Sequence, residues 1–120
     1  MSVFTITMLC LYSLGMAVGQ VLFKLAAMQA NTESISAFVC SLVSSWYFII
    51  SLLLYGTLTV LWVWLLTRTP LSHAYPFVVL AFAVTPIFAS LFLGERLDIW
   101  YFVSLLVIIT GLVLLVASIT

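Results

Sequence analysis

Long apolar segments alternate with short polar ones along this chain of 120 residues. Four of the apolar segments, at about residues 3–25, 46–67, 72–93 and 99–119, approach the roughly 20 residues that an α-helix needs to cross a bilayer. The pattern therefore predicts an all-α membrane protein, with four transmembrane helices in a single domain over residues 1–120. Four crossings would place both ends of the chain on the same side of the membrane.

The clearest turn signal lies between the third and fourth apolar segments, where three charged residues fall within the four positions 95–98. Gly94 can adopt the left-handed conformation that ends a helix, and the carboxylate of Asp98 can cap the helix that follows. This stretch predicts a tight hairpin between the third and fourth spans.

Polar side chains interrupt the apolar pattern between the first and second spans. Apolar residues such as Ile35, Phe38 and Leu42 nevertheless recur there at helical spacing. This combination is typical of a short helix that lies in the membrane surface, and we expect such a helix at about residues 34–45.

The composition supports a membrane protein and argues against several other classes. Hydrophobic residues make up 67% of the chain and charged residues 5%, whereas about 25% of residues in soluble domains are charged. The formal charge is zero and no basic cluster is present, so nucleic acid is a poor candidate partner. No catalytic or metal-ligand spacing is found, and we expect neither an enzyme nor a bound metal or cofactor. The membrane orientation stays open. The connections on one side of the membrane carry two basic residues and the connection on the other side carries one, and this difference is too small to decide the orientation.

Polar residues share one face of the first span. Tyr12, Met16, Gln20 and Lys24 follow one another at intervals of four, with Ser13 beside them. The amide of Gln20 needs hydrogen-bond partners and should face protein, a cavity or water. It could join helices or contact a substrate, and both interpretations stay open. Lys24 could extend to the lipid headgroups, or hold an anionic phosphate at the mouth of a groove.

The third span presents a gradient from polar to apolar side chains along one face, which includes Ser72, Tyr75, Phe82 and Pro86. Pro86 has no N–H to donate to the carbonyl of Phe82, so the helix should bend there. A ligand with a polar head and an apolar tail would fit this gradient, although ordinary helix packing explains most of the same residues.

The four spans contain no aspartate or glutamate. A proton-coupled exporter of cations usually needs a carboxylate within the membrane, so this chain lacks a central part of that mechanism. Gly15 and Gly19 form a small-xxx-small step on the first span, which would let a second backbone approach closely. That backbone could belong to another subunit or to the same one.

Several motifs resemble the drug/metabolite transporter superfamily. They are SLGMAVGQVLFK at residues 13–24, PLSHAYP at 70–76, LGERLD at 93–98 and ITGLV at 109–113. Within that superfamily the chain is similar to the four-helix small multidrug resistance proteins and to the EamA half-repeats. The resemblance covers nearly the whole chain and is weakest at residues 30–45. The LGERLD motif is fairly specific for the superfamily but says little about the substrate.

Two subgroups of the superfamily compete as relatives. The small multidrug exporters carry a glutamate at the position of Met16, which this chain lacks. The subunits of the aminoarabinose-phosphoundecaprenol flippase show a similar pattern, with Gly19, Gln20 and Lys24 here and an Ala-Tyr-Pro that ends at residue 76. The resemblance to the flippase implies transfer of a polyprenyl-phosphate-linked sugar across the bacterial inner membrane, for lipopolysaccharide or another envelope glycan. It also implies that Tyr75 lies in the binding site and that the chain works as a dimer.

The expected function is therefore that of a flippase subunit, paired with a second copy or a related subunit. Its expected substrate-binding residues are Gln20, Lys24, Tyr75, Tyr12, Ser13 and Ser72. Two alternatives are an exporter of small cations, such as drugs, polyamines or guanidinium-like compounds, and a non-transporting membrane subunit of a glycosyltransferase complex.

Overall fold

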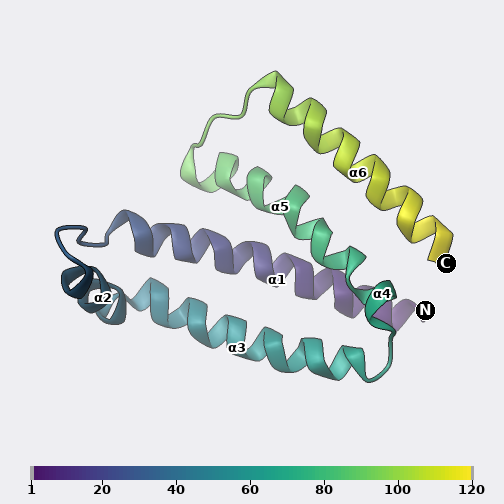
Figure 1. Cartoon of the computed structure of the whole chain (residues 1–120), viewed down its shortest axis with the longest axis horizontal. Coiled ribbons are helices and arrows are strands. Elements are labelled where there is room, and N and C mark those ends of the chain that lie inside the picture. Colours follow the sequence, from purple (N-terminus) through teal and green to yellow (C-terminus); the bar gives the residue numbers. More distant parts are fainter. Residues whose placement is uncertain (1, 120) are drawn as a thin grey trace.

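A computed structural model describes residues 2–119 and contains six helices in that range. These are α1 (Val3–Met28), α2 (Ile35–Ser44), α3 (Trp46–Leu66), α4 (Leu71–Ala74), α5 (Pro76–Leu93) and α6 (Ile99–Ile119) (Figure 1). Four helical segments are long and apolar enough to cross a membrane: α1, α3, α6, and α4 together with α5. The expectation of an all-helical chain with four segments long and apolar enough to cross a membrane is confirmed for the described residues.

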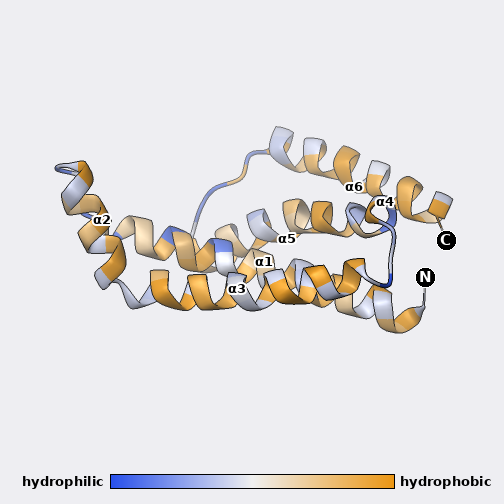
Figure 2. Ribbon diagram, turned by 60° about the horizontal axis from the view of Figure 1, so that its bottom comes forward, coloured by the Kyte–Doolittle hydropathy of each residue, from blue (hydrophilic) through white to orange (hydrophobic). Residues whose placement is uncertain are grey.

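Helix α1 is the central element of the bundle. It packs against α3 on one side and against α5 on the other, whereas α6 lies along α5 at the edge (Figure 1). The buried core cluster consists of Leu9, Leu65, Ala74 and Phe77 and lies near the end that holds the first residues of α1. Of the described residues of α6, Leu105 alone is buried. Large apolar side chains are exposed on all four spans, as contact with lipid would require. Figure 2 shows hydrophobic residues along each of these helices.

The connections follow the turn signals in the sequence. Gly94 adopts the left-handed conformation, with a φ of 68°, and ends α5. The carboxylate oxygen Oδ1 of Asp98 accepts a hydrogen bond of 2.8 Å from the backbone N–H of Tyr101, which caps the start of α6. The first and last described residues lie at the same end of the bundle, as four crossings predict (Figure 1).

Apart from shifts of one residue, the helices differ from the sequence prediction at two places. Helix α1 continues to Met28, three residues beyond its expected end. The third span is divided at Tyr75 into α4 and α5, because Pro76 has no N–H to bond the carbonyl of Ser72. The short helix expected at residues 34–45 is α2; the hydroxyl of Ser34 caps it by accepting a hydrogen bond of 3.1 Å from the N–H of Ala37.

We expect the substitution Gly94→Ala to destabilise the fold, because a Cβ makes the left-handed conformation unfavourable by about 1–2 kcal/mol. Gly111→Ala is the matched control, since Gly111 lies within α6 and an added Cβ would meet no atom within 4 Å. That control should be neutral or slightly stabilising. The free energy of unfolding in detergent micelles measures both; equal values for the two variants would contradict the role of Gly94.

Candidate functional site

The seam between α1 and α3 is built around Gly19. A Cβ at this position would lie 2.6 Å from Cε2 of Tyr55, so the absence of a side chain makes room for the tyrosine ring. The ring of Tyr55 stacks on Phe23, with centroids 5.1 Å apart and an interplanar angle of 10°. Gly15, one turn earlier, faces the side chain of Leu58 in the same way. Both glycines thus serve contacts within one chain.

Tyr55 fixes the orientation of the Gln20 amide through two hydrogen bonds. The Tyr55 hydroxyl donates to the backbone carbonyl of Met16 at 2.9 Å, and a carbonyl can only accept. The proton of the hydroxyl is therefore used, and its oxygen accepts a hydrogen bond of 2.8 Å from Nε2 of Gln20. The amide oxygen of Gln20 and one of its N–H groups remain free for another partner.

An open cavity of about 390 Å³ lies between α1, α5 and α6. It is lined by Met16, Gln20, Val78, Ala81, Phe82, Thr85, Pro86 and Tyr101. No charged side chain is among these residues. The cavity therefore offers apolar walls with a few uncharged polar groups between them.

Three polar groups besides Gln20 face this cavity or border it. The hydroxyls of Thr85 and Tyr101 have no hydrogen-bond partner among residues 2–119. Most helical threonines in this chain, by contrast, bond a carbonyl of the preceding turn, as Thr110 does. The third group is the backbone carbonyl of Phe82, which lacks its usual helical partner because Pro86 has no N–H. Because unpaired polar groups away from water cost free energy, these groups would gain from a ligand that bonds them.

The other expected site residues lie outside this cavity. Tyr12 stacks on Trp62 of α3 with centroids 5.0 Å apart, and Tyr75 meets the same ring edge-on at 6.4 Å. Ser72 is exposed on α4. Lys24 is exposed on α1, one turn beyond Gln20. The two tyrosines thus form an aromatic cluster around Trp62, separate from the cavity lining.

Ser13 occupies a packing position. It is fully buried, and its hydroxyl lies within hydrogen-bond distance of the backbone carbonyls of Leu9 and Phe77. The contact with Phe77 joins α1 to α5. In this conformation the side chain of Ser13 therefore connects helices and does not line the cavity.

Comparisons with family models, curated proteins and solved structures find no match to this chain. The transporter family that the motifs indicate therefore stays a hypothesis, and the case for a site rests on the geometry given above.

The sequence analysis did not select Tyr55, Thr85 or Tyr101. A signal existed for Tyr55, because a hydroxyl in the middle of an apolar span must find a hydrogen-bond partner on a neighbouring helix. Thr85 directly precedes Pro86, where the regular helical hydrogen bonds are interrupted. Tyr101 lines the cavity because α6 packs against α5, and this packing could not be read from the local sequence.

We expect Gly19→Ala to destabilise the protein by about 1–3 kcal/mol, because the added methyl group would displace the Tyr55 ring. Gly15→Ala is the matched control, since its methyl would meet the flexible end of Leu58 at 3.0 Å. The control should lose less stability. Unfolding in detergent measures both variants, and an unchanged stability of Gly19→Ala would contradict the described seam.

Proposed function

We propose that this chain is a subunit of a membrane transporter that moves a polyprenyl-phosphate-linked sugar between the two leaflets. The observation that carries this proposal is the uncharged, partly polar cavity beside Gln20. The hydroxyls of a sugar both donate and accept hydrogen bonds, and the free oxygen and N–H of the Gln20 amide complement both roles. The apolar walls suit a headgroup that crosses a bilayer in contact with lipid.

Lys24 supports the phosphate part of the proposal. It follows Gln20 by four residues on α1, which corresponds to about 6 Å along the helix axis. The two side chains share a helix face, so a sugar near Gln20 would place its phosphate within reach of the ammonium group. The polyprenyl tail would stay in the lipid beside the apolar outer surfaces of α5 and α6.

The proposal includes a dimer in the bacterial inner membrane, acting in lipopolysaccharide or envelope glycan modification. The cavity is open on one side, because α6 lies at the edge of the bundle and packs mainly against α5. A second copy or a related subunit would cover this open side. The resemblance of the motifs to flippase subunits supports the same assembly. Tyr75 and Tyr12 lie in the aromatic cluster around Trp62, outside the cavity lining, so in this proposal they would contact a part of the substrate other than the sugar beside Gln20.

We expect Gln20→Ala to slow flipping of an undecaprenyl-phosphate-linked sugar by about ten-fold, because the sugar would lose a hydrogen-bond partner within the cavity. Gln29→Ala is the matched control, since Gln29 is exposed at the end of α1 and does not line the cavity. The measurement is the leaflet accessibility of the labelled lipid in proteoliposomes. Equal rates for the two variants would remove Gln20 from the site.

Lys24→Ala should reduce flipping in the same assay, because the phosphate would lose its cationic partner. Arg96→Ala is the control, since it removes a positive charge from the hairpin at the same end of the bundle.

Export of small cations coupled to a proton gradient, without lipid flipping, would instead favour a cation exporter. Co-purification with a glycosyltransferase whose activity depends on this chain, without flipping, would favour a non-transporting subunit.

Tyr55→Phe tests the orientation of the Gln20 amide. The phenylalanine ring keeps the stacking on Phe23 but loses both hydrogen bonds of the hydroxyl. We expect flipping to slow less than in Gln20→Ala, and stability to fall by about 1 kcal/mol. Flipping as fast as in the unmodified protein would show that the amide needs no fixed orientation.

A further inference from the structure

A second cavity, of about 420 Å³, lies at the opposite end of α1 from Lys24. It is lined by Ser2, Thr5, Arg68, Thr69, Pro70 and His73. These residues come from the start of α1, the turn after α3 and the first residues of α4. The proposed transport site does not use this cavity, although Pro70 and His73 also belong to the PLSHAYP motif.

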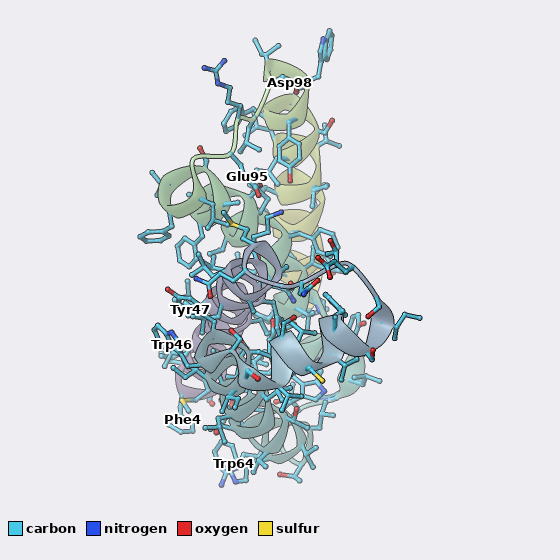
Figure 3. The ribbon with its side chains drawn as sticks, turned by 90° about the vertical axis from the view of Figure 1, so that its left-hand side faces the viewer. Phe4, Trp46, Tyr47, Trp64, Glu95 and Asp98 are labelled. Atoms are coloured by element: carbon cyan, nitrogen blue, oxygen red, sulfur yellow. The ribbon has the colours of Figure 1, made fainter. Side chains whose placement is uncertain are left out.

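Arg68 is held at the cavity by an aromatic platform. Its guanidinium carbon lies 4.4 Å from the centroid of the Trp64 ring, and Phe4 packs edge-on against that ring at 6.1 Å (Figure 3). Tryptophan rings favour the depth of the lipid headgroups. Contact with the ring does not use the hydrogen-bonding capacity of the guanidinium N–H groups, which stay available for an anion.

The hydroxyl groups of the cavity add hydrogen-bond donors. Thr69 is 5% exposed, and its hydroxyl has no partner among the described residues. The hydroxyls of Ser2 and Thr5 lie 2.9 Å apart, and the Ser2 oxygen also accepts from the N–H of Thr5. Whichever of these two hydroxyls donates to the other, one proton is left over for a further acceptor.

No acidic side chain balances Arg68 at this end of the bundle. The three acidic residues of the chain, Glu33, Glu95 and Asp98, follow α1 or connect α5 to α6 at the opposite end (Figures 1 and 3). The imidazole of His73 contributes one more N–H donor in either neutral form. The cavity thus combines a cation and several donors, which is the complement of an anion with several oxygens.

We propose that this cavity binds a phosphate group at the membrane surface, on the face opposite Lys24. A phosphate presents several acceptor oxygens and a negative charge, which match the Arg68 guanidinium and the surrounding O–H and N–H donors. It would also supply the partner that the buried Thr69 hydroxyl lacks. The phosphate can belong to an anionic phospholipid headgroup or be free in solution. This site stands independently of the proposed transport function.

The test is binding of phosphatidylglycerol and, in a separate arm, of inorganic phosphate to the full chain in a neutral detergent, measured by native mass spectrometry. We expect Arg68→Gln to weaken phosphatidylglycerol binding by about ten-fold, because a charge-assisted hydrogen bond is lost. Arg96→Gln is the matched control, since it removes the same charge at the other end of the bundle. Equal binding by the two variants would overturn the proposal.

Thr69→Val separates binding from folding. The substitution keeps the shape of the side chain and removes the unpartnered hydroxyl, so stability should not fall while phosphatidylglycerol binding weakens. A loss of stability with unchanged binding would show that the Thr69 hydroxyl does not contact the phosphate. Phosphatidylglycerol binding without inorganic phosphate binding would support a headgroup site. Binding in both arms would support recognition of the phosphate itself, and binding in neither would overturn the site.

Discussion

The close approach of α1 and α3 at Gly19 is the constraint on which the candidate site depends. Because Gly19 has no side chain, the Tyr55 ring fits against α1 and its hydroxyl reaches the carbonyl of Met16. That bond uses the only proton of the hydroxyl and so determines which end of the Gln20 amide faces away from α3. A backbone feature of one helix thereby sets the hydrogen-bonding character of a cavity formed with two others.

The hairpin and the spans could be read from the sequence because their signals are local. Segment length and composition determine which stretches suit lipid, and Gly94 and Asp98 act on the backbone within a few residues. The division of the third span at Tyr75 was not predicted, although the missing N–H of Pro76 is a local cause as well.

The candidate site was predictable only in part, because helical spacing defines a face but not its neighbour. Gln20 lines the cavity, whereas Ser13 is sealed against Phe77, and Tyr12 and Tyr75 meet on Trp62. Which helix covers each part of the polar face depends on how α3 and α5 approach α1. Those approaches are set by side chains far apart in the sequence, such as the pair formed by Gly19 and Tyr55.

The uneven distribution of charge between the two ends has a consequence for insertion. Arg68 gives one end a charge of +1, while two basic and three acidic side chains give the α2 end +2 − 3 = −1. A transmembrane voltage acts on net charge, at about 2.3 kcal/mol per elementary charge per 100 mV, and draws the Arg68 end toward the negative compartment. The count of basic residues alone, by contrast, favours placing the α2 end in the negative compartment. The two influences oppose each other, so one added or removed basic side chain near a helix end would set the direction in which the whole bundle enters the bilayer.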